Sequence, residues 1–206
     1  MGQLKNIIFD LGGVLLNIDY YITEQAFRDM GFLDFEKMYS QYSADAVFEK
    51  LETGDISNES FYNTIIERAN SQITREQIAL AWNAMLLDFR EETLDFLESL
   101  GPGYDLYLLS NTNAIHLAAF NEIFFKQTGK TSLNNYFKKA YYSHEVGLRK
   151  PNEDIFEFVL KDAGLLAEES LFIDDSYNNI HAAQMLGFTT HLLVPGEKVE
   201  NLKGYW

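Results

Sequence analysis

The sequence predicts an α/β protein with a doubly wound parallel sheet, of the Rossmann-like kind, that carries an all-helical insertion. Several short apolar runs are continuous rather than alternating, which is typical of strands buried on both faces. Amphipathic helical patterns separate most of these runs, and such alternation favours a doubly wound sheet. Between the first run and the second, helical patterns instead follow one another without a convincing strand, which indicates an insertion.

Each predicted strand is a short apolar run that ends in polar residues. Runs of this length, bounded by turn-forming residues, are typical of buried parallel strands. The predicted strands are Asn6–Asp10, Asp105–Asn111, Ala140–His144, Ser170–Asp175 and Thr190–Val194.

Three helices are predicted in the sheet-forming part of the chain. Glu91–Leu100 places leucines on one face and ends at Gly101. Asn152–Ala163 begins with an asparagine, a residue type that caps helices. Ser176–Leu186 ends at Gly187, which suits the residue after a helix.

The insertion is predicted to be a helical lid. Ser57 and Thr74 are suitable N-caps within it. The chain therefore divides into a core of residues 1–16 and 89–206 and a cap of residues 17–88. Ligands bind at the carboxyl ends of parallel strands, so a lid would cover that edge. The helical patterns of the cap run over about 22–30, 35–50, 57–70 and 74–87.

Composition narrows the possible partners. The 206 residues include 31 acidic and 16 basic side chains, a formal charge of −15, and no cysteine. Nucleic acid and anionic membrane surfaces require clustered basic residues, so neither is the expected partner. The lack of cysteine excludes disulfides, thiolate metal sites and thiol nucleophiles. No signal sequence or long apolar run occurs, and we expect a cytoplasmic protein.

Acidic and polar residues end three of the predicted strands. Asp10, Ser110-Asn111 and Asp174-Asp175 would meet at one edge of a parallel sheet. Strand-end acids often only cap the next helix, but two adjacent acids exceed what a cap needs. Carboxylates in one crevice repel one another unless a cation is present. Oxygen ligands without cysteine or clustered histidine favour Mg²⁺.

Neighbouring residues suit phosphoryl chemistry. Gly12 and Gly13 follow Asp10 and would let backbone N–H groups approach a phosphate closely. Ser110 and Asn111 would supply a hydroxyl and an amide to phosphoryl oxygens. Lys150 would neutralise a dianion, although alone it would more often be a surface lysine.

These motifs resemble, in order, the four motifs of the haloacid dehalogenase-like hydrolases, and they extend over nearly the whole chain. The helical insertion is similar to the first type of cap in that family. The stretches Ser110–Asn113 and Phe48–Ser57 are most similar to the bacterial glucose-1-phosphate phosphatase subgroup and to the phosphatase half of soluble epoxide hydrolase. The four motifs lie in Ile8–Leu15, Leu109–Asn113, Arg149–Pro151 and Phe172–Ile180.

The resemblance implies an Mg²⁺-dependent phosphatase for a small phosphorylated metabolite, with a sugar phosphate favoured. Asp10 would be the nucleophile and form an aspartyl-phosphate. Mg²⁺ would be held by Asp10, the Gly12 carbonyl and Asp175, with Asp174 as a direct or water-mediated ligand. The transferred phosphoryl group would be held by Ser110, Asn111 and Lys150, and Asn179 would support the metal ligands.

One position departs from the pattern of the family's phosphatases. They usually have a second aspartate, a general acid/base, where this chain has Gly12. Loss of such a group is worth roughly 10²–10⁴-fold in rate. The glucose-1-phosphate subgroup resembles this chain in having glycine there, and sugar-1-phosphates have comparatively good leaving groups. Asp19 and Glu52 are candidate replacements, and each is otherwise a solvated surface acid.

Three other functions stay open from the sequence: a 2-haloacid dehalogenase, a non-catalytic phosphate- or Mg²⁺-binding regulatory protein, and a phosphotransferase. The four histidines have no ligand spacing, and Arg149 is expected to be a loop cation, with a substrate contact as the alternative. The cap aromatics are expected to be mostly core, with one or two facing the crevice; they are Tyr20, Tyr21, Tyr39, Tyr42, Phe48 and Trp82. The substrate, the oligomeric state and the cap motion are not set by these residues.

Overall fold

The computed structural model describes residues 3–40, 44–69, 72–101, 103–202 and 204–205. It confirms the predicted α/β fold. A five-stranded sheet has the order β5-β4-β1-β6-β7, and all its pairs are parallel. The predicted strands are found within two residues of their expected ends. They are β1 Asn6–Phe9, β4 Asp105–Ser110, β5 Lys139–Tyr142, β6 Ser170–Asp174 and β7 Thr189–Leu192.

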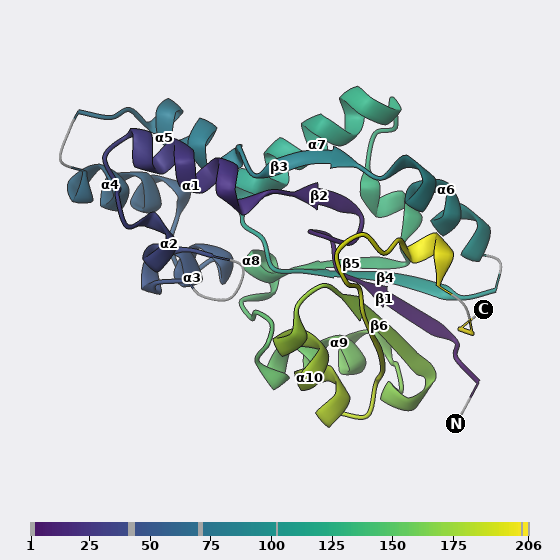
Figure 1. Ribbon diagram of the computed structural model, residues 1–206. Helices are drawn as coiled ribbons and strands as arrows, with labels where there is room; N and C mark the ends of the chain where they lie inside the picture. Colours follow the sequence, from purple (N-terminus) through teal and green to yellow (C-terminus); the bar gives the residue numbers. More distant parts are fainter. Residues whose placement is uncertain (1–2, 41–43, 70–71, 102, 203, 206) are drawn as a thin grey trace.

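The continuous apolar runs reflect a sheet that is covered on both faces (Figure 1). The side chains of Ile7 and Phe9 in β1 pack into the hydrophobic cluster on one face of the sheet. The side chain of Ile8 packs into a second cluster on the opposite face. One face is covered by α6 Glu91–Leu100 and α7 Ala114–Thr128, and the other by α9 Glu153–Ala163 and α10 Tyr177–Met185.

Two details of these helices differ from the sequence analysis. The α7 helix was not predicted, although Asn113 caps it by accepting hydrogen bonds from the backbone N–H groups of Ile115 and His116. Asn152 precedes α9 as predicted, but its side chain makes no capping hydrogen bond. Asparagine identity alone therefore did not decide where a cap forms.

Within the described part of the chain, the cap contains five helices, α1–α5. Large aromatic side chains fill its interior, among them the buried Phe48, Phe61 and Trp82. Ser57 and Thr74 cap α4 and α5 as predicted, and Thr74 forms a reciprocal capping box with Gln77. The helices are α1 Tyr20–Asp29, α2 Phe35–Met38, α3 Ala46–Glu52, α4 Asn58–Arg68 and α5 Arg75–Asn83.

The single helix predicted over 35–50 is wrong. The α2 helix ends at Met38 because Tyr39 is extended and forms a β-bridge with Ala44. Asp45 then starts α3 by accepting a hydrogen bond from the backbone N–H of Val47.

The expectation that the insertion contains no strand is also wrong. Strand β3, Leu86–Phe89, pairs antiparallel with β2, Leu16–Ile18, in a two-stranded ribbon. Both segments connecting cap and core therefore run side by side. Short elements complete the structure: α8 Ser143–Val146, and the 3₁₀ turns Leu133–Tyr136, Ala167–Glu169 and Val199–Asn201.

The cap lies beyond the carboxyl ends of the sheet strands, next to α8 (Figure 1). The division into a core of 1–16 and 89–206 and a cap of 17–88 stays a prediction. Among the residues described, no helix is both long and apolar enough to cross a bilayer.

Candidate active site

The sheet register brings the predicted acids together. Phe9 of β1 pairs with Leu108 on one side and Ile173 on the other, so the residues after these positions share one edge. The Asp10 backbone N–H donates to the Ile173 carbonyl at 2.9 Å and extends that pairing. Oxygens of Asp10, Asp174 and Asp175 lie within 4.8 Å of one another.

Lys150 lies among these acids rather than at the surface. Its Nζ donates to Asp10 Oδ1 and Asp174 Oδ2, each at 2.7 Å, and to the Leu109 carbonyl at 2.9 Å. Only 1% of the residue is exposed. Burial would lower the pKa of Lys150, but Asp10 and Asp174 outweigh burial and raise the pKa, so the lysine keeps its charge.

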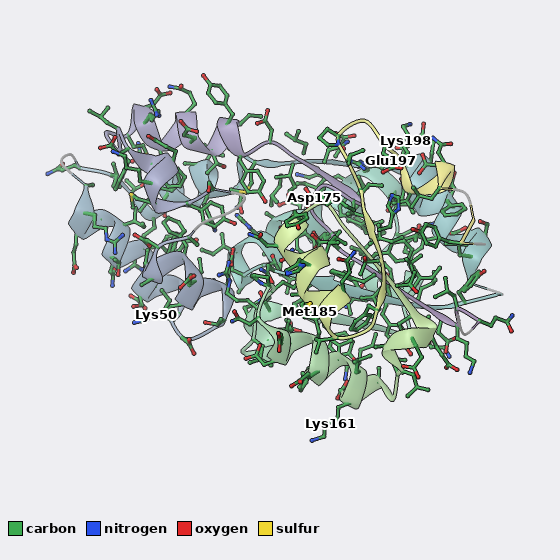
Figure 2. All side chains as sticks on the ribbon, turned by 60° about the horizontal axis from the view of Figure 1, so that its bottom comes forward. Lys50, Lys161, Asp175, Met185, Glu197 and Lys198 are labelled. Carbon is green, nitrogen blue, oxygen red and sulfur yellow. The ribbon has the colours of Figure 1, made fainter. Side chains whose placement is uncertain are left out.

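Asp174 is held by the protein through both carboxylate oxygens. Oδ1 accepts from the backbone N–H of Ser176 at 2.8 Å, and Oδ2 accepts from Lys150. The Asn179 amide donates to both oxygens, at 2.9 and 3.0 Å. Asp174 is therefore a fixed, buried charge. Asp175, which Figure 2 shows near the start of α10, is only half-buried and lines the cavity described below.

The cluster has more negative than positive charge. Burial is the largest cause that raises the pKa of Asp10, and Asp174 and Asp175 act in the same direction; with Lys150 opposing them, the pKa is raised to about 8. Burial, followed by the charge of Asp174, raises the pKa of Asp175 to about 6. A divalent cation among these oxygens would relieve the repulsion, and an all-oxygen donor set is the type that Mg²⁺ prefers. The residues present therefore fit a magnesium ion.

Asn111 and Ser110, the polar pair after β4, have different surroundings. The Asn111 side chain exchanges two hydrogen bonds with the Lys150 backbone, each 2.8 Å long. Ser110 is buried beside it, 3% exposed, and does not line the cavity. Asn111 therefore fixes the segment that carries the buried lysine.

Glycine is required at position 13, three residues after Asp10. Gly13 has φ +73°, and a Cβ there would lie 2.2 Å from Asp175 Oδ2. Any side chain would displace the Asp175 carboxylate. Gly12 lines the cavity between Asp10 and the cap.

A cavity of about 250 Å³ lies between the acids and the cap. The core contributes Asp10, Asp175, Lys150 and other polar residues, and the cap contributes side chains from α1, α3 and the segment after α2. The cap residues at the cavity are Tyr20, Tyr39, Ser40, Ala44, Glu49 and Glu52.

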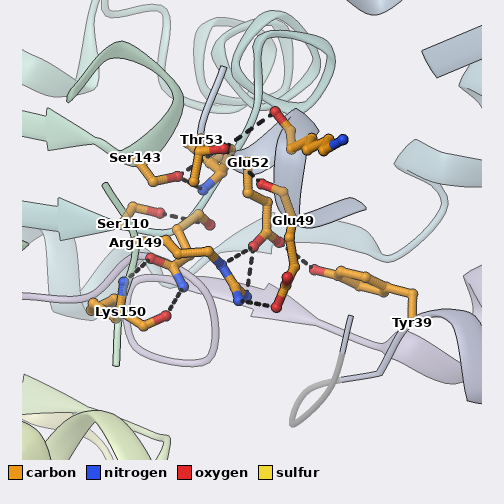
Figure 3. Close-up of polar contacts among 11 residues, drawn as sticks. Tyr39, Glu49, Glu52, Thr53, Ser110, Ser143, Arg149 and Lys150 are labelled. Atoms are coloured by element: carbon orange, nitrogen blue, oxygen red, sulfur yellow. Dashed lines mark hydrogen bonds and ion pairs between the residues drawn. The ribbon is translucent and has the colours of Figure 1, made fainter. Parts of the chain in front are cut away.

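Arg149 lies in the loop between α8 and α9, as expected, but it is paired with acids of the cap. Its guanidinium extends from the core to the cap, where Nε and Nη2 lie 2.9 and 2.8 Å from Glu52 Oε2 (Figure 3). Its Nη1 bonds Glu49 Oε1 at 3.0 Å. The Tyr39 hydroxyl donates to the other Glu52 oxygen at 3.0 Å. The ion pairs of Arg149 therefore connect the core to the cap at the wall of the cavity.

Two further expectations can now be compared with the structure. Asp19 caps α1 by accepting from the backbone N–H of Tyr21, whereas Glu52 is buried at the cavity rather than solvated. Of the six cap aromatics expected to be mostly core, Phe48 and Trp82 are buried, Tyr20 and Tyr39 line the cavity, Tyr21 is exposed, and Tyr42 lies outside the described residues. Sequence reasoning missed Glu49 as a cavity residue, because which face of α3 points to the core depends on how the cap docks.

The fold and this site define an α/β protein in which a helical cap lies over an aspartate-rich centre. A profile of haloacid dehalogenase-like hydrolases matches residues 4–187. The chain belongs to that family, which confirms the resemblance carried by the four motifs.

The chain is similar to other members of the family over most of its length. It is 35% identical to a D-ribitol-5-phosphate phosphatase of Bacteroides thetaiotaomicron, over 91% of each chain. It is 36% identical, with a TM-score of 0.88, to a HAD family enzyme of the same organism, covering 95% of this chain and 96% of that one. That crystal structure is of an aspartate-to-alanine variant in complex with magnesium and inorganic phosphate. A predicted HAD-like hydrolase of Porphyromonas gingivalis has 37% identity and a TM-score of 0.86, covering 95% of this chain and 94% of its own.

Proposed function

We propose that the protein is an Mg²⁺-dependent phosphatase that hydrolyses a small sugar or sugar-alcohol phosphate through an aspartyl-phosphate on Asp10. The observation that carries the proposal is the arrangement of Asp10, Asp175 and charged Lys150 around one end of a small polar cavity. Similarity to a D-ribitol-5-phosphate phosphatase supports the substrate class. Similarity to a structure with magnesium and phosphate supports the cofactor.

Each site residue has a distinct proposed role. Asp10 is the nucleophile, and Asp10, Asp175 and the Gly12 carbonyl would hold Mg²⁺. When bound, the ion would neutralise charge on the phosphoryl oxygens and on the carboxylates. Asp174 is proposed to contact the metal through a water molecule or to act only by positioning Lys150. Its carboxylate oxygens already accept hydrogen bonds from Lys150, Ser176 and Asn179.

The phosphoryl group is proposed to be held mainly by Lys150. Its Nζ lies 2.7 Å from Asp10 Oδ1, so a phosphoryl group reacting at Asp10 would come within its reach. Ser110 and Asn111 complete the set expected to bind that group. The structure favours a positioning role for Asn111, since its side chain is bonded to the Lys150 backbone.

The proposed reaction has two displacements at phosphorus. The Asp10 carboxylate attacks phosphorus, the bond between phosphorus and the substrate oxygen breaks, and that oxygen takes a proton from water and leaves as the alcohol. Water then attacks the aspartyl-phosphate, which releases inorganic phosphate and restores the carboxylate. Lys150 keeps a positive charge beside both transition states.

Gly12 has no proton to give to the leaving alcohol. Of the two replacements suggested by the sequence, Glu52 lines the cavity and Asp19 caps a helix. Charge neutralisation by Lys150 and the metal is therefore proposed to supply most of the catalysis.

A 2-haloacid dehalogenase is less consistent with this site. That reaction also uses an aspartate nucleophile but needs no metal, which would leave the adjacent Asp174 and Asp175 unexplained. A non-catalytic phosphate- or Mg²⁺-binding protein would keep the same cluster but show no turnover.

Phosphate release from a panel of sugar and sugar-alcohol phosphates, with and without Mg²⁺, tests the proposal. We expect Mg²⁺-dependent turnover that Asp10→Asn abolishes, whereas Asp95→Asn on α6, outside the cavity, leaves it unchanged. Metal binding without turnover on any substrate would favour the regulatory function. Release of halide from 2-haloacids without metal would favour the dehalogenase.

A further inference from the structure

The outer wall of the cavity is built from charged and hydroxyl groups that the proposed phosphoryl chemistry does not use. Tyr39, Glu49 and Glu52 come from the cap, and Arg149 comes from the core. These groups lie where the part of a substrate beyond its phosphate would extend. They therefore bear on which alcohol the enzyme accepts.

Glu52 is a buried carboxylate held in a fixed orientation. It is 3% exposed, and Oε2 accepts both close contacts from Arg149. Among the residues described, Oε1 accepts one hydrogen bond, from Tyr39. A carboxylate oxygen has two acceptor positions, so Oε1 retains capacity for one more donor.

Arg149 does not present an unpaired positive charge to the cavity. Its Nε and Nη2 are committed to Glu52, and its Nη1 is committed to Glu49. One guanidinium thus serves two carboxylates, and this wall of the cavity is net negative. Figure 3 shows the guanidinium between the two glutamates.

We propose that Glu52, positioned by Tyr39 and Arg149, accepts a hydrogen bond from a substrate hydroxyl and, with Glu49, excludes phosphates that carry a second anionic group. The inference rests on the proposed phosphatase function. It narrows the substrates to monophosphates of polyols or sugars that have no anionic group besides the phosphate. A neutral hydroxyl offers the donor that Glu52 lacks. A carboxylate or second phosphate in the same place would meet like charge at low dielectric.

The test compares two ligands that differ at one end. D-ribitol 5-phosphate has a terminal CH₂OH group, and 5-phospho-D-ribonate has a carboxylate there. p-Nitrophenyl phosphate, which has neither a polyol chain nor a second anion, reports the core chemistry alone. Values of kcat and KM for all three are measured with saturating Mg²⁺ in the unmodified protein, Glu52→Gln and Glu49→Gln/Glu52→Gln.

The matched control is Glu59→Gln. Glu59 is an exposed cap glutamate on α4 that pairs with Arg75 at 3.0 Å and does not line the cavity. The Glu59→Gln substitution removes one negative charge from the cap, as Glu52→Gln does. Melting temperatures verify that each variant is folded.

We expect the unmodified protein to prefer ribitol phosphate by at least about tenfold in kcat/KM, mostly through KM. Glu52→Gln should reduce that preference about tenfold, and the double variant should reduce it further because Arg149 is released to bind the carboxylate. Glu59→Gln should keep both the preference and the turnover of p-nitrophenyl phosphate within about threefold of the unmodified protein.

Three results would overturn the inference: no preference in the unmodified protein, a preference in Glu52→Gln within about twofold of the original, or loss of p-nitrophenyl phosphate turnover in folded Glu52→Gln. The last would place Glu52 in the core chemistry. If the unmodified protein hydrolyses neither these three compounds nor any member of the sugar-phosphate panel, the proposed function fails. Calorimetric binding of the two pentose-derived phosphates then decides the inference: tighter binding of ribitol phosphate supports it, and equal binding overturns it.

Discussion

The side chain of Asn111 and the backbone of Lys150 exchange two hydrogen bonds, each 2.8 Å long, across 39 positions of sequence. The Asn111 amide donates to the Lys150 carbonyl, and its Oδ1 accepts from the Lys150 N–H. This pairing joins the end of β4 to the segment that delivers the buried lysine. The position of Lys150 Nζ between Asp10 and Asp174 therefore depends on Asn111. Among the hydrogen bonds described, Asn111 makes none with either acid.

Asn111→Ala is expected to lower both stability and turnover. Two partly buried backbone groups lose their partners, which costs about 1–3 kcal/mol. A displaced Lys150 should also reduce kcat by about 10²-fold, since small misplacements of catalytic groups have effects of that size. Urea unfolding and Mg²⁺-dependent phosphate release measure the two effects.

The exposed Asn121 on α7 provides the matched control. Asn121→Ala should change stability by no more than about 0.5 kcal/mol and leave turnover intact. An Asn111→Ala protein with full kcat would show that Lys150 is positioned by other contacts.

Lys150→Met is expected to destabilise the metal-free protein by about 3–5 kcal/mol, because it leaves Asp10 and Asp174 buried without their cation. Added Mg²⁺ should restore part of the stability, because its positive charge would neutralise the same carboxylates. Turnover should not return, because the charge beside the phosphoryl group is lost.

Lys139→Met removes an exposed lysine that pairs with Asp162 at 2.6 Å. Exposed pairs are worth at most about 1 kcal/mol, so this variant should unfold nearly as the unmodified protein does. Thermal unfolding with and without Mg²⁺ distinguishes the two lysines. Equal losses in both variants would contradict a special role for Lys150.

The sheet and its acids could be predicted from the sequence because both depend on local patterns. A strand buried on both faces is apolar throughout, and Ile7, Ile8 and Phe9 show that pattern directly. A parallel register then places whatever follows each strand at one edge. Asp10 and Asp174 follow from these two facts, without knowledge of the loops.

The cap wall could not be predicted in the same way. Arg149 meets Glu52 across 97 positions of sequence, and the contact exists only because the cap docks in one orientation. The break between α2 and α3 depends on the bridge between Tyr39 and Ala44, which also brings Tyr39 to Glu52. Such long-range pairings leave no periodic signal in the residues that make them.

His116 is expected to make stability depend on pH. It is buried against Trp82, ring centroids 4.5 Å apart, and its Nε2 lies 3.0 Å from the Trp82 carbonyl, which requires the proton on that nitrogen. Burial lowers the pKa of His116 to about 4 in the folded protein. The unfolded chain, with a pKa of about 6.5, takes up the proton first as pH falls.

Stability from this histidine is thus complete above about pH 6.5 and is lost as pH falls towards 4. Between pH 7 and 5 the loss is about 2 kcal/mol. His116→Gln, which retains an amide donor, should remove that part of the pH dependence in urea unfolding, whereas His181→Gln at an exposed site on α10 should not. If the free energy of unfolding falls equally between pH 7 and pH 5 in His116→Gln and in the unmodified protein, His116 is not the source of the pH dependence.

Gly13→Ala is expected to weaken metal binding selectively. Its φ of +73° makes alanine unfavourable by about 1 kcal/mol, and the new Cβ would lie 2.2 Å from Asp175 Oδ2. Gly129 separates these two effects, since its φ is +70° but a Cβ there meets nothing within 4 Å. Gly129→Ala should therefore share the loss of stability and keep Mg²⁺ affinity, measured as the Mg²⁺-induced rise in Tm. If Gly13→Ala keeps that rise as well, Asp175 can move without loss of the ion, and its proposed role as a direct ligand is wrong.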